Sequence, residues 1–478
     1  VIVPAVYPFR VAVLGPAEPR QPGPPPRGPP GRTLRSTLLP AAALSGCPWV
    51  PAAQAPGAPQ RPPIVFVHGN GDNAALWMTT LWRFESNGWP RERLHAITLP
   101  YPLARDADDQ AQPGRSSSEE ARRFLAAEVD AVLQRSGASQ VVLVGNSRGG
   151  IVIRNYVAGG GAPKVSHAIL GGAPNHGVWS SASFRPTSEF NGAGPLLTRL
   201  NNQGGAGIEI TPGPKWLTIR SDNNDKYAQA DGAWIGAKGT PTHVSFAGPE
   251  LKGAQNVVIA GIDHRETAFG PQAFAAMWRF LTGSEPATTR AVPEARITLA
   301  GMLSGAAVDN LPLAGATVEV YATDLSTGAR LGAALHRQTV GADGRWGPLI
   351  TTSKTALEFV VTAPGHAITH VYRAPFARSS DLVQLRAARI AVDDRDAPAV
   401  VTLTRPRGYF GIPRDEIELD GLSPPAGIPA GVAGVSTAKA RLADAGERAV
   451  AGAFNGERIV GRSWPTAGNH VVFLELHD

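Results

Sequence analysis

The stretch at residues 141–150, VVLVGNSRGG, constrains the fold of this chain more than any other feature. Its first four residues are apolar and mostly β-branched, which is typical of a buried parallel strand. The Gly-x-Ser-x-Gly pattern that follows indicates a sharp turn from that strand into a helix beginning near Gly149. We expect glycine at 145 and 149 for steric reasons, because such a turn packs closely against its neighbours. The strained turn would hold the hydroxyl of Ser147 at the carboxyl edge of a sheet.

Apolar strands and amphipathic helices alternate through the first part of the chain. Ser117 and Glu120 have the spacing of a capping box at the start of a long helix that Gly137 ends. Strands are expected at 62–67, 94–99, 141–144, 165–170, 216–220 and 256–260, and helices at 74–87, 117–137 and 272–281. This alternation predicts an α/β domain over residues 59–283, with a mainly parallel sheet covered on both faces.

The pattern changes after a linker at residues 284–293. Short alternating strands and turns follow, for example the turn at 341–344. They predict a β-sandwich domain over residues 294–388. Residues 389–478 are expected to form either a further β domain or the second half of a composite one.

The first 58 residues read as a disordered leader that ends in an export signal. A basic start at Arg32 and Arg35 precedes a short apolar run and then Cys47. The sequence Leu-Ser-Gly-Cys resembles a bacterial lipoprotein box, which would attach a lipid to Cys47. The alternative is cleavage after the Ala-Gln-Ala at 53–55. Either signal predicts a secreted or cell-envelope protein, and no later stretch is long and apolar enough to span a membrane.

Charge and cysteine content exclude several classes of protein. The net charge is +6, but five of the arginines lie in the leader, and no basic stripe interleaved with aromatic residues occurs elsewhere, so nucleic acid is excluded as a partner. The one cysteine rules out a disulfide within the chain and a cysteine-based metal site. We expect neither a metal nor a cofactor.

The end of the strand expected at 62–67 carries a second chemically informative turn. Its sequence, His-Gly-Asn-Gly-Asp at 68–72, lets the backbone approach a bound molecule without a Cβ in the way. At this position a backbone N–H, here that of Asn70, would pair with the N–H of Arg148. Together they form an oxyanion hole beside Ser147.

A serine hydroxyl becomes a nucleophile when an imidazole takes its proton and a carboxylate fixes the imidazole tautomer. Strand ends after Ser147 supply Asp222 or Asp225 and then His264, in the chain order serine, acid, histidine. Asp225 is favoured, because the loop must extend a little beyond the sheet edge to reach the imidazole. Asp263 adjoins His264 and is poorly placed to bond its neighbour's ring.

Three further residues are candidates for the substrate pocket: His68, Asn146 and His176. His176 lies in a turn beside the elbow and precedes any acid, so it fits a pocket residue better than a base. The glycine- and serine-rich insertion at 175–214 is either a cap over the pocket or a surface loop.

These segments resemble the bacterial and archaeal lipases of the α/β-hydrolase superfamily. VFVHGNG, VVLVGNSRGG and KVSHAIL carry the likeness. Residues 285–289 and 372–376 are similar to a narrower group, the archaeal-type carboxylesterases and lipases with a C-terminal β domain. The resemblance implies an α/β-hydrolase fold followed by all-β C-terminal domains. It suggests that the β region assists binding to a lipid or polymer surface, the alternative being a stabilising appendage.

The chain departs from that group at two positions. The group's acid sits where this chain has Gly171 and Gly172, so the acid would have moved to the next strand end, which favours Asp225. The residue before the serine is Asn146 in place of the more usual histidine, a change expected to alter the acyl pocket.

The sequence therefore predicts an exported serine esterase or lipase that hydrolyses acyl esters through a Ser-His-Asp triad and an acyl-enzyme. One alternative is a depolymerase of aliphatic polyesters, which the same chemistry serves. An alternative of another class is a non-catalytic hydrolase-fold protein that binds lipid or polymer. The expected partners are an ester lipid or polyester and a lipid interface, and the oligomeric state is left open.

Overall fold

The computed structural model describes residues 61–205 and 207–477. The predicted leader at 1–58, its export signal and the lipid attachment at Cys47 lie outside these residues. Within the described part, no helix is long and apolar enough to cross a membrane.

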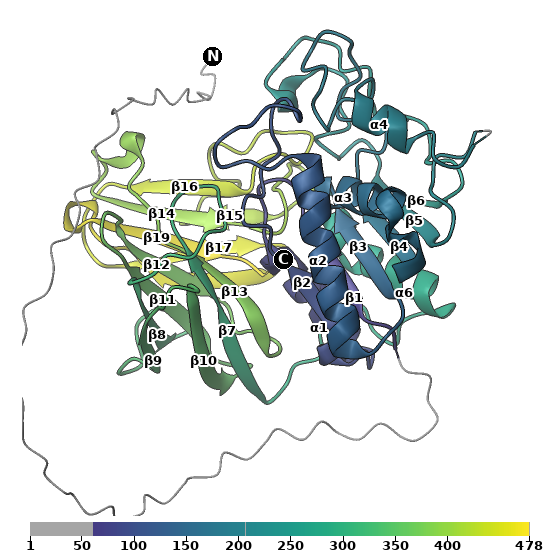
Figure 1. Ribbon diagram of the computed structural model, residues 1–478. Coiled ribbons are helices and arrows are strands. Elements are labelled where there is room, and N and C mark those ends of the chain that lie inside the picture. The colour runs from purple at the N-terminus through teal and green to yellow at the C-terminus, as the bar shows by residue number, and fades with distance from the viewer. Residues whose placement is uncertain (1–60, 206, 478) are drawn as a thin grey trace, which may run out of the picture. The chain divides into compact units, whose positions relative to one another are not determined.

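A six-stranded parallel sheet forms the centre of the first region (Figure 1), in the order β2-β1-β3-β4-β5-β6. Because the strands are parallel, their carboxyl ends meet at one edge. The predicted α/β fold with a parallel sheet is confirmed. The strands are β1 (Ile64–Val67), β2 (Leu94–Ile97), β3 (Val141–Asn146), β4 (Val165–Gly171), β5 (Lys215–Ser221) and β6 (Gln255–Ile259).

Helices cover both faces of this sheet and bury two apolar cores. One core joins α1 (Met78–Ser86) and α6 (Pro271–Thr282) to the sheet, and the other joins α2 (Ser118–Ser136) and α3 (Arg148–Tyr156) to it. The capping box predicted for α2 is present in both directions, and Gly137 ends the helix with φ 65°. A left-handed residue at this position favours glycine.

Shorter elements complete the first region. The predicted helix at 74–87 begins as a 3₁₀ turn, η1 (Ala74–Trp77), which the side chain of Asn73 caps before α1. The described part of the insertion at 175–214 contains one short helix, α4 (Pro195–Leu200), packed on Ile151. The others are η2 (Arg91–Arg93), η3 (Val157–Gly161), η4 (Ala162–Lys164), η5 (Ala233–Ile235) and α5 (Glu266–Phe269).

The C-terminal region is built from three sheets (Figure 1), with strand orders β10-β7-β13, β16-β14-β19-β12-β11-β8-β9 and β15-β17-β18. The predicted all-β C-terminal region is confirmed. Its strands are β7 (Arg296–Ser304), β8 (Thr317–Thr323), β9 (His336–Thr339), β10 (Arg345–Thr352), β11 (Ala356–Thr362), β12 (Ile368–Arg373), β13 (Ser380–Arg386), β14 (Ala399–Thr404), β15 (Ile417–Leu419), β16 (Thr437–Leu442), β17 (Ala449–Phe454), β18 (Glu457–Arg462) and β19 (His470–Glu475), with the short turns η6 (Val392–Asp394) and η7 (Thr466–Gly468).

The large sheet runs across the domain boundary predicted at 388/389. Its strand β19, near the end of the chain, pairs in parallel with both β12 and β14 and so joins the two β segments. Each three-stranded sheet shares a core with one part of the large sheet. The predicted domain limits themselves stay predictions.

The first region is packed against the β region through apolar and polar contacts. Met78 and Trp82 of α1 belong to the same buried core as the strands β7, β8 and β11. Asn310, which is 3% exposed, donates hydrogen bonds to the carbonyls of Asp72 and Leu99. These two carbonyls lie beside the carboxyl edge of the parallel sheet, so the β region reaches that edge.

Candidate active site

Ser147 lies between β3 and α3 with φ 54° and ψ −122°. A non-glycine residue at positive φ is strained, and such strain persists where the surrounding structure enforces it. The adjoining glycines show what enforces it. A Cβ at Gly145 would come within 2.7 Å of Gly149, and one at Gly149 would lie 2.3 Å from the carbonyl oxygen of Val67. The steric reason expected for both glycines is confirmed by these distances.

Asp225 and His264 meet beyond the ends of β5 and β6. His264 Nδ1 lies 2.9 Å from Asp225 Oδ2, and the two side chains are 3% and 9% exposed. The other carboxylate oxygen of Asp225 accepts the backbone N–H of Tyr227 at 2.8 Å. A carboxylate in this place fixes the His264 tautomer with its proton on Nδ1, leaving Nε2 as an acceptor.

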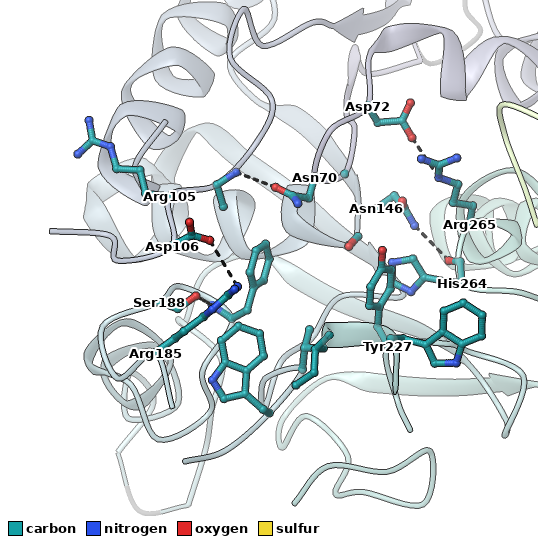
Figure 2. Close-up of a pocket in the computed structure, with 18 of the residues that line it drawn as sticks. Asn70, Asp72, Arg105, Asp106, Asn146, Arg185, Ser188, Tyr227, His264 and Arg265 are labelled. Atoms are coloured by element: carbon teal, nitrogen blue, oxygen red, sulfur yellow. Dashed lines mark hydrogen bonds and ion pairs between the residues drawn. The ribbon is translucent and has the colours of Figure 1, made fainter. Parts of the chain in front are cut away.

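His264 Nε2 is buried and has no hydrogen-bond partner among the described residues. His264 and Ser147 line the same cavity of about 250 Å³, here called the serine cavity. The Tyr227 ring packs on the imidazole in a T-shaped arrangement, with 4.7 Å between the ring centroids. Figure 2 shows Tyr227 and His264 side by side.

The other carboxylates considered for the acid are engaged elsewhere. Asp222 accepts the backbone N–H groups of Gly261 and Asn224, at 3.1 Å and 3.2 Å. Asp263 forms a 2.6 Å ion pair with Arg405 of the β region. Of the acids weighed from the sequence, Asp225 is therefore the one that the structure brings to His264.

The two expected oxyanion donors are Asn70 and Arg148. The Asn70 side chain accepts the N–H of Ala104 at 2.7 Å (Figure 2), and its own backbone N–H has no partner in the described part of the chain. Arg148 is the first residue of α3, and N–H groups in a first helical turn have no partner within the helix. Both N–H groups are thus available to a ligand, and the helix dipole favours negative charge there.

The side chain of Arg148 is directed away from the serine cavity. Its guanidinium forms two hydrogen bonds to the carboxylate of Glu189, at 2.8 Å and 2.9 Å, where the side chains are 2% and 0% exposed. It also donates to the Ser116 hydroxyl and carbonyl. This buried network fixes the start of α3 from the insertion at 175–214.

His68 supports the turn that contains Asn70. Its Nε2 accepts the N–H of Leu99 at 3.0 Å, and Nδ1 donates to the Gly69 carbonyl at 2.8 Å. Burial lowers the pKa of His68, and nearby Arg148 lowers it too, against opposing contributions from Asp72 and Gly69. His68 is thus a neutral ring that holds the turn, and it is not among the residues lining the serine cavity.

Asn146 links the elbow to the loop of His264. Its side-chain amide donates to the carbonyls of Gly171 and His264, at 3.1 Å and 3.4 Å, and Figure 2 shows the second bond. Asn146 is 1% exposed and also lines the serine cavity. Asn146 therefore lies in the pocket, as expected from the sequence. Its hydrogen bond to the loop of His264 was not expected from the sequence.

His176 does not line the serine cavity, although Asp225 and Tyr227 line the same neighbouring cavity as His176 does. It lies 3.1 Å from Glu209 and lines this second cavity, of about 530 Å³. The insertion around it does reach the serine cavity, through Val178, Trp179, Arg185, Ser188 and Phe190. The role of the insertion as a cap over the pocket stays a prediction.

The end of β4 explains the absence of an acid there. A Cβ at Gly171 would lie 2.6 Å from the carbonyl of Thr267, and one at Gly172 would lie 2.9 Å from that of His264. The loop that carries His264 passes so closely that only glycine fits. The acid therefore has room at the end of β5 and none at the end of β4.

Several residues that line the serine cavity were not predicted from the sequence. Tyr409 lines it from the β region, more than 140 positions after His264. Arg265 pairs with Asp72 at 3.3 Å on the cavity wall (Figure 2). No local spacing connects residues so far apart, and the only local signal is the arginine-rich stretch at 405–414. Within the described residues, no group of His, Cys, Asp or Glu could hold a metal ion.

Two protein families match the chain. Residues 61–183 match class 2 lipases, and residues 295–390 match the lipase C-terminal domain. No curated protein is significantly similar to the chain.

Among solved structures, the mature lipase BlEst2 of Bacillus licheniformis is 21% identical over 47% of this chain and 94% of that one, with a TM-score of 0.34. The monoacylglycerol lipase of Paleococcus ferrophilus is 14% identical over 48% and 96%, with a TM-score of 0.32. The phospholipase PlaB of Legionella pneumophila is 12% identical over 69% and 93%, also with a TM-score of 0.32. The resemblance expected from the sequence is confirmed by the family matches: the chain joins a region similar to class 2 lipases to one similar to lipase C-terminal domains.

Proposed function

We propose that this chain is a serine esterase or lipase that hydrolyses acyl esters through an acyl-enzyme. The family match over residues 61–183 supports a hydrolase that acts on esters. One observation carries the finer assignment. His264 and Ser147 line the same cavity, the His264 Nδ1 is hydrogen-bonded to Asp225 at 2.9 Å, and its buried Nε2 has no hydrogen-bond partner among the described residues.

Acylation is the first half of the proposed reaction. Ser147 Oγ attacks the ester carbonyl while His264 Nε2 takes its proton, and Asp225 stabilises the imidazolium. The N–H groups of Asn70 and Arg148 bind the oxyanion of the tetrahedral intermediate. One such donor is worth about 3 kcal/mol of barrier. His264 then protonates the leaving alcohol, and the acyl group remains on Ser147.

Deacylation repeats these steps with water. His264 removes a proton from the water, which attacks the acyl carbonyl, and the proton passes to Ser147 as the acid leaves. The cavity suits an ester with an apolar part, since Val178, Trp179 and Phe190 are among the residues that line it. Arg105, Asp106 and Arg185 add polar groups to the lining, and Figure 2 shows the ion pair between Asp106 and Arg185.

Turnover of p-nitrophenyl esters from acetyl to palmitoyl, by the full chain and by Ser147→Ala, tests the proposal. We expect turnover by the wild type and its loss in the variant. The acyl length with the highest kcat/KM defines the preference, and a film of aliphatic polyester as a parallel substrate tests for depolymerase activity. Equal turnover by Ser147→Ala would overturn the mechanism.

A fluorophosphonate probe distinguishes this enzyme from a non-catalytic binding protein. The probe labels a serine whose hydroxyl is activated by a neighbouring base. We expect labelling at Ser147 that ester substrate suppresses. A folded wild type that the probe leaves unlabelled would favour the binding protein.

A further inference from the structure

The turn that carries His264 is held by the C-terminal β region through a buried carboxylate. Asp263, the residue before His264, is 0% exposed. Arg405 Nη1 donates to Asp263 Oδ2 at 2.6 Å, and the backbone N–H of Tyr409 donates to the same oxygen at 2.8 Å. The other oxygen, Oδ1, accepts the N–H groups of Arg265 and Glu266, at 2.7 Å and 3.0 Å. The carboxylate of the residue before His264 thus connects the segment 405–409 to the backbone N–H groups that follow His264.

The negative charge of the Asp263 carboxylate maintains its bonds to the β region. Burial by itself would raise the pKa of Asp263, but Arg405, Arg414 and two backbone N–H groups outweigh it and hold the pKa below its ordinary value. The carboxylate therefore stays ionised. Arg405 also donates to Glu266 at 2.7 Å, and Arg414 donates to Glu266 at 2.7 Å and to the Gly261 carbonyl at 3.1 Å. The turn is held at both ends.

The loop of Asp225 is joined to the same part of the β region. Lys226, the next residue, donates to the Gly434 carbonyl at 2.9 Å. Its ammonium lies 3.8 Å from the centroid of the Tyr409 ring, which is close enough for a cation–π contact. Tyr409 also lines the serine cavity beside His264. The β region therefore contacts the loops of both residues and the cavity between them.

We propose that Arg405 is a positioning residue for His264, acting through Asp263. The inference rests on the proposed function, since it assigns a role to the group that holds the general base. Arg405 is not among the residues that line the serine cavity. Instead its planar fork ties Asp263 and Glu266 together and fixes the loop between them. A displacement of about 1 Å at a reacting group lowers rates by up to about 100-fold.

Arg407 offers a matched control two residues along the chain. It is 1% exposed, and donates to the carbonyls of Ala75, Leu476 and His477 at the same boundary between the regions. Arg405→Lys and Arg407→Lys each keep a positive charge and lose the planar fork. If the β region only stabilises the fold, the two substitutions should affect activity alike.

The experiment compares kcat, KM and the melting temperature of full-length Arg405→Lys and Arg407→Lys, using a p-nitrophenyl ester. We expect kcat of Arg405→Lys to fall about 10- to 100-fold, with KM within about twofold of wild type. Fluorophosphonate labelling should slow in parallel. Arg407→Lys should keep its kcat although its melting temperature falls. Equal kcat in the two folded variants would overturn the proposal.

A double variant keeps the test decisive if Arg405→Lys fails to fold. Asp263→Asn combined with Arg405→Met removes the pair without leaving one buried charge alone, a change that proteins often tolerate. We expect it to fold with a lowered kcat, and a wild-type kcat would overturn the proposal. Ser147→Ala separates the two hypotheses. If Ser147→Ala stays active the proposed function fails, whereas an inactive Ser147→Ala beside fully active Arg405 variants refutes only the positioning role.

Discussion

Asp225 and His264 share a 2.9 Å hydrogen bond across the ends of β5 and β6, and Asp222, three residues earlier, is turned to the backbone of Gly261 instead. The two aspartates are separated by one loop, yet only one of them touches the imidazole. Chain order allowed either residue to be the acid. The bond to His264 Nδ1 gives the physical reason to prefer Asp225.

Asp225→Asn should lower kcat by about 10³- to 10⁴-fold, because an amide can leave the imidazole in the wrong tautomer. Ester turnover measured beside Asp222→Asn checks this expectation. The second variant keeps the acid and loses bonds to backbone N–H groups, so we expect its kcat within about tenfold of wild type. Equal losses in the two variants would contradict the assignment of Asp225.

Glu189→Gln should destabilise the fold strongly. The substitution leaves the Arg148 guanidinium buried without its carboxylate, and breaking a buried pair in this way costs about 3–5 kcal/mol. Burial raises the pKa of Glu189, and Arg148 opposes that rise. Urea unfolding measures the loss as a lower midpoint at an unchanged slope.

An exposed ion pair provides the control for Glu189→Gln. Lys164 and Asp130 lie 2.5 Å apart with side chains 47% and 57% exposed. Exposed pairs contribute at most about 1 kcal/mol. Asp130→Asn should therefore leave the midpoint nearly unchanged, and a similar loss in both variants would show that burial of the Arg148 pair has no special effect.

Local patterns predicted the first region closely. The alternation of strands and helices, the capping box at Ser117 and Glu120, and the glycine that ends α2 each depend on residues near one another in the chain. The turn at Ser147 belongs to the same class, since its geometry follows from a strand, a glycine-rich turn and a helix in succession. Chain order then brought His264 and an acid to the same sheet edge.

Contacts between distant residues were outside the reach of such patterns. The Arg405–Asp263 pair spans 142 positions, and the Arg148–Glu189 pair joins a helix to an irregular insertion. The sequence indicated that Asp263 is poorly placed to bond the His264 ring, because the two residues are adjacent. In the structure Asp263 pairs with Arg405 instead. The pairing of β19 with β12 and β14 also depends on the assembled sheet and has no local signature.

Gly149→Ala should destabilise the elbow by about 3 kcal/mol and reduce activity further. The added Cβ would lie 2.3 Å from the Val67 carbonyl, so β1 or α3 must shift, as in other overpacked sites. Gly305→Ala serves as the control, since its nearest neighbour would be 3.7 Å away. Urea unfolding of both variants checks the prediction. A loss within about 0.5 kcal/mol, the range for ordinary surface changes, would contradict the steric role of Gly149.

His477 should make the fold sensitive to mild acid. Its ring packs on Phe376 and Trp82, and burial, together with Arg373 and Arg407, lowers its pKa to about 3. Because the pKa in the folded state lies below that of about 6.5 in the unfolded chain, the proton binds the unfolded state first. The contribution of the neutral His477 ring to the unfolding free energy is therefore complete above pH 6.5 and is lost as the pH falls toward 3.

A non-titrating variant isolates this contribution from those of the other histidines. Between pH 7.5 and pH 5 the wild type should lose about 2 kcal/mol more of its unfolding free energy than His477→Gln does, since each pH unit below 6.5 costs about 1.4 kcal/mol. Urea unfolding at both pH values measures the difference, and contributions from His68 and His95 cancel in it. Parallel losses in the two proteins would mean that His477 gains no proton on unfolding in this range. The wild type would in that case owe its acid sensitivity to other groups.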